Sequence, residues 1–109
     1  MKNFVQDGDV ISVTAPYALT SGQGCLVGSL FGIAVKDYEN GAAAEIRRDG
    51  VFDVTALSTD TASQGAKLYW DNTNRRLTTT ASGNTLVGVA TVAKTSGQTT
   101  ARVLLGNFA

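Results

Sequence analysis

Short apolar segments separated by turn residues run along the whole chain, and this rhythm is what most constrains the fold. Segments rich in valine, leucine, threonine and aromatic residues return about every 8–15 residues. Clusters of Gly, Asn, Asp and Ser stand between them and favour tight turns. The pattern predicts an all-β fold: a small single-domain β-barrel or sandwich of about eight short strands, with at most one short helix.

The first two expected strand regions differ in their pattern. Val10–Ala15 alternates in polarity and stops at Pro16, which cannot donate a main-chain hydrogen bond to a sheet. The run Cys25–Val35 is apolar on both faces and predicts one strand that crosses the core. Gly28 and Gly32 interrupt this run and are expected to form bends or bulges.

The middle of the chain is more ambiguous. Ala42–Arg48 contains good helix formers but has no amphipathic stripe, so both strand and helix remain open. Two strands, Ala44–Arg48 and Val51–Ala56, joined into a hairpin through Asp49-Gly50, is the preferred interpretation. Ser58–Gly65 is a polar loop with room for one helical turn.

The stretch "KLYWDNTNRRL" combines a lysine, a tyrosine, the single tryptophan and a carboxylate, so it resembles a reactive cluster. Strand alternation separates these groups, because Leu68 and Trp70 share one face while Lys67, Tyr69 and Asp71 share the other. Two strands joined around "DNTN" therefore form the expected hairpin, with Leu68 and Trp70 on its core face.

Composition argues against several functional classes. The 109 residues contain no histidine, which is the commonest general base and metal ligand at neutral pH. Cys25 is the single cysteine and lies in an apolar run, so a buried structural thiol is expected. Asp7 and Asp9 lack the ligand ladder of a calcium loop. We therefore expect no enzyme activity, no cofactor and no metal.

Charge and hydropathy bear on the partners. Nine basic and nine acidic residues cancel, whereas nucleic-acid binding usually depends on a basic excess. The most apolar run is about half the length of a membrane span, and the first residues lack the apolar core of a signal peptide. We expect a soluble protein made in the cytoplasm that binds neither nucleic acid nor membrane. Only 17% of the residues are charged, so copies repel one another weakly, which favours self-assembly.

Six segments follow one another along the chain: "MKNFVQDGD" at the N-terminus, "GSLFGIAV" (Gly28–Val35), "DGVFDV" (Asp49–Val54), "GAKLYWD" (Gly65–Asp71), "LVGVA" (Leu86–Ala90) and "ARVLL" near the end. In this order they resemble a family of small tailed-phage capsid decoration (cement) proteins, and the resemblance covers essentially the whole chain. The resemblance implies a compact, homotrimeric β domain on the outer surface of the expanded head in the virion. Its partner would be the major capsid protein lattice, which it stabilises by clamping neighbouring subunits, without catalysis.

Contact residues follow from physics, since no motif of the family marks them. The segment 1–6 precedes the first clear strand and can act as an N-terminal arm that adds to a sheet edge of the shell protein. The candidate contacts are Met1, Lys2, Asn3, Phe4, Val5 and Gln6. Phe4 and Val5 can equally form a first strand on this domain's own core. Leu105 and Phe108 are candidates for self-association, with ordinary core packing as the alternative.

One other class of function remains open from the sequence alone. A small β-barrel can bind single-stranded nucleic acid or a glycan on its exposed sheet. That function needs aromatic residues gathered on one face beside basic residues, and neither gathers in the sequence. The pairs Arg47-Arg48 and Arg75-Arg76 point their side chains to opposite faces when they lie on a strand.

Overall fold

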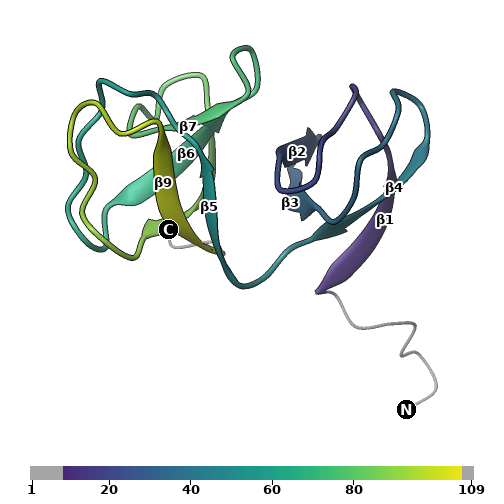
Figure 1. Ribbon diagram of the computed structural model, residues 1–109, viewed down its shortest axis with the longest axis horizontal. Coiled ribbons are helices and arrows are strands. Elements are labelled where there is room, and N and C mark those ends of the chain that lie inside the picture. Colours follow the sequence, from purple (N-terminus) through teal and green to yellow (C-terminus); the bar gives the residue numbers. More distant parts are fainter. Residues whose placement is uncertain (1–8, 107–109) are drawn as a thin grey trace.

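The computed structural model describes residues 9–106, and within that range it contains nine strands and no helix (Figure 1). All nine strands are short, between three and six residues. They are β1 (Val10–Thr14), β2 (Gly24–Val27), β3 (Leu30–Ala34), β4 (Ala43–Arg47), β5 (Val51–Thr55), β6 (Lys67–Asp71), β7 (Arg76–Thr78), β8 (Thr85–Ala90) and β9 (Thr100–Leu105). The predicted all-β class is confirmed.

The strands form two antiparallel sheets that follow one another along the chain. The first sheet has the order β1-β4-β3-β2, and the second has the order β5-β9-β8-β6-β7. Figure 1 shows them side by side, joined by the short segment between β4 and β5. The second sheet curls until Ala56 bridges Leu77, but it does not close into a barrel.

Each sheet has its own group of buried side chains. The first group contains Ala15, Tyr17, Leu19, Cys25, Ala34, Ala44 and Ile46. The second contains Ile33, Val54, Ala56, Leu68, Trp70, Leu77, Val87, Ala90, Ala101, Val103 and Leu105. Ile33 comes from the first sheet yet packs in the second group, so the two halves share apolar contacts. That both halves form one cooperative domain stays a prediction.

The prediction of one strand over Cys25–Val35 is wrong. The run folds back at Gly28, whose φ of 61° suits glycine, and gives the hairpin of β2 and β3. The run is apolar on both faces because both sides of a hairpin are covered, and not because one strand crosses the core. Cys25 packs with the first group of buried residues and Phe31 packs against the second, so the hairpin is covered on both sides.

The predicted hairpin through Asp49-Gly50 is also wrong, although both of its strands exist and Ala43–Arg47 is a strand and not a helix. β4 lies between β1 and β3, whereas β5 pairs with β9 in the other sheet. Gly50 has a φ of 106°, and its carbonyl accepts a hydrogen bond from Leu105 N. The Asp-Gly turn therefore redirects the chain from one sheet to the other.

The hairpin predicted in "KLYWDNTNRRL" is confirmed. β6 and β7 pair with Trp70 opposite Leu77, and Leu68 is buried beside them. Asp71 organises the turn, because its carboxylate accepts hydrogen bonds from the main-chain N–H groups of Thr73 and Asn74. Its pKa lies below the ordinary value, chiefly because of the side-chain hydrogen bond from Asn74.

A buried lysine fixes the polar loop Ser58–Gly65, which forms no helix. Lys94 is only 4% exposed, and its Nζ donates to the main-chain carbonyl of Asp60 at 2.8 Å and of Ser58 at 3.4 Å. The Asp60 carboxylate in turn accepts hydrogen bonds from Thr78 Oγ1 at 2.7 Å and from Thr79 N at 3.0 Å. These contacts tie the loop to the end of β7.

Candidate binding cleft between the two sheets

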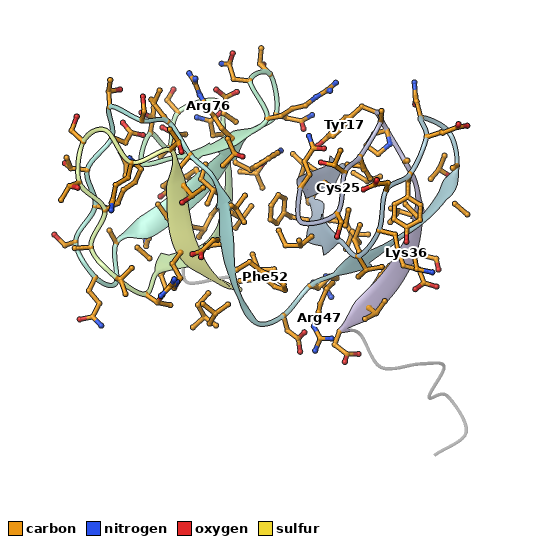
Figure 2. The ribbon with its side chains drawn as sticks, viewed as in Figure 1. Tyr17, Cys25, Lys36, Arg47, Phe52 and Arg76 are labelled. Carbon is orange, nitrogen blue, oxygen red and sulfur yellow. The ribbon has the colours of Figure 1, made fainter. Side chains whose placement is uncertain are left out.

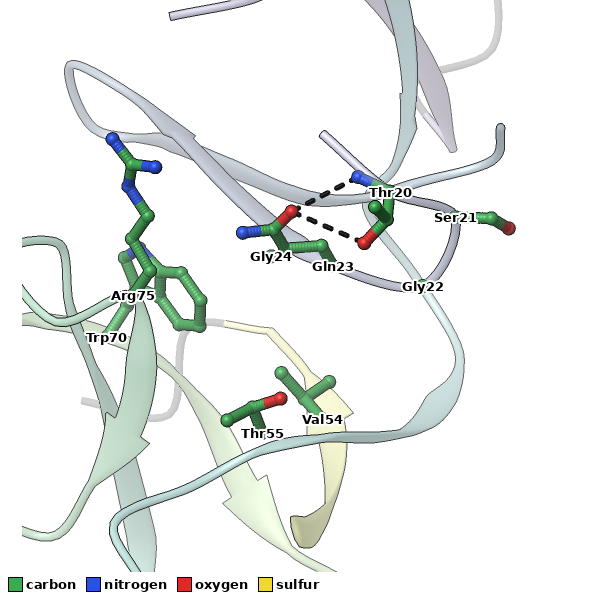
Figure 3. Close-up of a pocket in the computed structure, with 9 residues that line it drawn as sticks. All are labelled: Thr20, Ser21, Gly22, Gln23, Gly24, Val54, Thr55, Trp70 and Arg75. Atoms are coloured by element: carbon green, nitrogen blue, oxygen red, sulfur yellow. Dashed lines mark hydrogen bonds between the residues drawn. The ribbon is translucent and has the colours of Figure 1, made fainter. Parts of the chain in front are cut away.

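A cleft of about 310 Å³ lies between the two sheets. Figure 3 shows one wall, a loop from the first sheet, facing Trp70 and Arg75 of the β6–β7 hairpin, with Val54 and Thr55 of β5 below. The lining residues are Thr20, Ser21, Gly22, Gln23, Gly24, Val54, Thr55, Trp70 and Arg75. Its volume lies at the lower end of the range of small-molecule pockets.

Trp70 joins the two sheets at the floor of the cleft. Its side chain is 1% exposed, and its ring centroid lies 5.2 Å from that of Phe31 on β3. The indole also lies directly against Gly24 of β2, where a Cβ would come within 2.8 Å of two ring carbons. A side chain at position 24 would therefore push the sheets apart.

A small polar network lies beside the indole. Trp70 Nε1 donates to Asn72 Oδ1 at 3.1 Å. The Tyr17 hydroxyl lies 3.1 Å from the Gly24 carbonyl oxygen and 3.3 Å from the same Asn72 oxygen. Burial, reinforced by the nearby Cys25, raises the pKa of Tyr17, so the hydroxyl keeps its proton at neutral pH and serves as a donor. Figure 2 shows Tyr17 at the boundary between the two halves.

Arg75 stands at the mouth of the cleft in an unusual conformation. Its φ of 55° makes it the one non-glycine residue between 9 and 106 with positive φ. Such a backbone is strained for a long L side chain and is worth explaining where it occurs. Arg75 Cζ lies 3.8 Å from the centroid of the Tyr17 ring, so a cation–π contact holds the guanidinium beside the cleft.

The free edge of β5 forms another part of this region. Leu105 N donates to Gly50 O and Ala56 N donates to Thr99 O, so the even-numbered residues of β5 bond with β9. Antiparallel alternation directs the main-chain groups of the odd-numbered residues to the opposite side. Among residues 9–106, no strand pairs with that side of β5. Shortly after β5 ends, Leu57 N donates a hydrogen bond to Leu77 O.

A second exposed feature lies on the outer face of the five-stranded sheet. Val51 is 51% exposed and stands opposite Leu104, which in turn stands opposite Val89. These three partly exposed side chains form an apolar row across β5, β9 and β8. Beside the row, Arg102 and Asp53 form a salt bridge at 2.9 Å. The hydrogen bond from Arg102 lowers the pKa of Asp53.

The contact residues predicted from the sequence fall mostly outside this description. Met1–Gln6 and Phe108 lie outside the described residues, so their predicted contacts stay predictions. Leu105 is 7% exposed and packs in the second group of buried residues, which is the alternative that the sequence left open. Cys25 is fully buried, as predicted, and burial raises the pKa of its thiol.

Sequence reasoning missed the cleft. The apolar row was missed as well, because both are assembled from strands that are remote along the chain. One local signal pointed toward the cleft: a single tryptophan beside an Asn-rich turn and two arginines. Tyr17 contacts Arg75 and Asn72 of this stretch from the other half of the molecule, and no pattern in the sequence around Tyr17 indicates these contacts.

The groups that line the cleft are able to bind a ligand. Between residues 9 and 106, no three or more Asp, Glu, Cys or His side chains gather where they could hold a metal ion. No helix in that range has the length and apolarity needed to cross a membrane. The cleft offers main-chain groups, hydroxyls, the Gln23 amide and one guanidinium, a set suited to holding a peptide or another polar ligand.

Comparison with known families identifies the chain. A family model described as phage cement protein matches residues 5–105, which is nearly the whole length. No curated protein and no solved structure matches the chain. A match of this extent agrees with the resemblance found in the sequence, and the chain belongs to the phage cement protein family.

Proposed function

We propose that this protein is a virion component that binds the outer surface of the expanded phage capsid and clamps neighbouring subunits of the major capsid protein. The observation that carries the proposal is the family match over residues 5–105. Cement proteins stabilise a capsid, and the binding surfaces of the two-sheet fold suit such a role. The proposal assigns the protein no catalytic step and no cofactor.

Clamping relies on many modest contacts acting together. A chain of 109 residues can offer only a small interface to each neighbour. When symmetric copies contact several subunits at once, the second and later contacts become intramolecular and retention rises steeply. We assign Met1–Gln6 to one such contact, as an arm that adds to a sheet edge of the shell protein.

Self-association into a homotrimer belongs to the same proposal. The outer-face apolar row of Val51, Leu104 and Val89 supports it, since an exposed apolar row beside a neutralised ion pair is easily desolvated. The net charge of zero adds little repulsion between copies. A second copy of this chain is therefore the occupant that we assign to the row.

The test uses purified protein and expanded shells that lack it. We expect the protein to bind the shells at saturable stoichiometry and to raise the temperature at which they disrupt, measured by light scattering and calorimetry. Absence of binding to such shells would overturn the proposal. Light scattering of the protein alone reports the oligomer, and Val51→Lys should shift a trimer toward monomer. A monomer at every concentration would refute the homotrimer and leave shell binding to stand by itself.

A further inference from the structure

The cleft between the two sheets has the features of a groove for an extended peptide. It meets the unpaired side of β5 at Val54 and Thr55, and the odd-numbered residues of this strand direct main-chain N–H and C=O groups to that side. A peptide laid there pairs as an additional strand, a mode in which the main chain gives affinity and alternate side chains give specificity. The five residues of β5 span about 17 Å, and the cleft contacts the end of the strand formed by Val54 and Thr55.

The surroundings of this edge favour one strand over a bulky ligand. The loop Thr20–Gly24 forms the opposite wall, and its residues other than Gln23 have small side chains or none. Thr20 N donates to Gln23 Oε1 at 3.1 Å, which braces the loop without closing the groove (Figure 3). The floor is formed by Val54 and Trp70, whose side chains are almost completely buried, so the accessible lining of the groove is mainly polar.

The charge of the groove selects the occupant. Arg75 is the single charged residue among the nine that line it, so the groove is cationic and lacks any carboxylate of its own. Its guanidinium stays beside the opening through the contact with Tyr17 and is exposed to solvent. A planar guanidinium held in place binds a carboxylate in bidentate fashion. An acidic side chain on the incoming strand is therefore the complementary partner.

We propose that the groove between β5 and the loop Thr20–Gly24 binds an extended acidic segment of the shell protein, which adds as a strand to β5 and places a carboxylate on Arg75. This inference rests on the proposed function, because it takes the shell protein as partner. The chain's own segment Met1–Gln6 is assigned elsewhere, as the arm that adds to a sheet edge of the shell protein. A second copy is likewise assigned elsewhere, to the outer-face apolar row.

The experiment compares wild-type protein with two variants of equal charge change. Arg75→Gln removes the guanidinium at the groove, and Lys67→Gln removes an exposed cation on the same hairpin but on the outer face. Binding to expanded shells is measured by co-sedimentation. We expect Arg75→Gln to weaken binding about tenfold and Lys67→Gln to change it less than about twofold. Circular dichroism and melting temperature check that both variants are folded.

A second measurement locates the added strand. Overlapping 12-residue peptides that cover the shell protein are titrated into isotope-labelled protein, and the amide signals are followed by NMR. We expect an acidic peptide to shift the amides of Val51, Asp53 and Thr55 and to compete with shell binding. The same peptide with alternate main-chain nitrogens methylated should lose this effect, because methylation removes the donors that a strand needs.

The outcomes separate the two proposals. If wild-type protein binds shells, yet Arg75→Gln binds equally well and no peptide shifts the β5 amides, the groove proposal is refuted and the shell-binding function stands. A shift produced by the peptide Met1–Gly8 of this chain, and by none from the shell protein, would refute it too. If wild-type protein binds no shells, the proposed function fails and the groove proposal fails with it.

Discussion

Replacing Trp70 by alanine should remove the main contact between the two sheets. The indole is 1% exposed, packs against Phe31 and Gly24, and donates its N–H to Asn72. Truncation of a buried Trp typically costs about 3–5 kcal/mol, and an aromatic pair adds about 0.5–1.5 kcal/mol to simple burial. We expect the upper half of that range, because two sheets anchored by separate hydrogen-bond ladders cannot collapse easily onto the cavity.

The size of this loss is large for a domain of this length. Folded domains are stable by about 5–15 kcal/mol, so the variant loses a third or more of a typical value. With an m-value of about 1.5 kcal/mol/M in urea, a loss of 4 kcal/mol would lower the midpoint by about 2.7 M. Urea titrations of wild type and variant should be followed by far-ultraviolet circular dichroism, since the substitution removes the single tryptophan of the chain.

Two controls make the Trp70 experiment sharper. Trp70→Phe keeps most of the apolar contact but removes the Nε1 donor, so it should cost about 1–2 kcal/mol. Hydrogen exchange shows whether the sheets unfold together: amides of β4 and β9 should lose protection to the same extent if the chain is one cooperative domain. A loss below about 1 kcal/mol for Trp70→Ala would refute the view that this side chain joins the sheets.

Other predictions test separate parts of the fold. Lys94→Met should cost about 1–3 kcal/mol in urea unfolding, because it leaves buried carbonyls without their donor, whereas the exposed Lys67→Met should stay within about 0.5 kcal/mol. Gly88→Ala should cost about 2–3 kcal/mol, since a Cβ there would collide with the carbonyl oxygen of Leu104; a melting temperature equal to wild type would contradict this. Burial acts to raise the pKa of Asp60, but hydrogen bonds from two threonines and a lysine charge lower it overall, below 3.8. Its carboxylate therefore stabilises the fold above about pH 4, and this contribution disappears as the pH falls through the lowered pKa. The stability difference between wild type and Asp60→Asn should be constant at neutral pH and shrink below pH 4, and a difference independent of pH down to 2 would show that the charge plays no part.

Local patterns in the sequence predicted what local interactions decide. The Trp70 hairpin was predicted with the correct core face because alternation and turn residues both act within eleven residues. Burial of Cys25 followed in the same way from its apolar neighbours. Pairing between distant strands was not predictable, since an Asp-Gly turn specifies a change of direction and not the partner that the next strand meets. β4 and β5 show this, because β4 pairs with β3 in one sheet whereas β5 pairs with β9 in the other.

The run Cys25–Val35 shows why a two-faced apolar pattern misleads. It predicts a strand with both faces covered, and both faces are indeed covered, but by two different groups of buried residues on either side of a hairpin. Gly28 was expected to bend a strand, and its positive φ reverses the chain instead. Periodicity and composition indicate which side chains are buried. The number of strands that carry these side chains depends on contacts between residues that are distant in the sequence.

A binding surface of this kind is difficult to predict from a sequence, for a physical reason. A free strand edge binds through main-chain groups that every residue carries, so no residue type identifies β5 as an edge. Arg75 is the exception, because its backbone conformation is unfavourable for a long side chain and its position is fixed by Tyr17 from the other sheet. Strain at an exposed cation beside an unpaired edge is difficult to explain by folding alone, since Gly or Asn would occupy that turn position more favourably. Arg75→Gly should therefore raise the melting temperature or leave it unchanged while weakening attachment to shells. A lower melting temperature with unchanged attachment would assign Arg75 to stability instead.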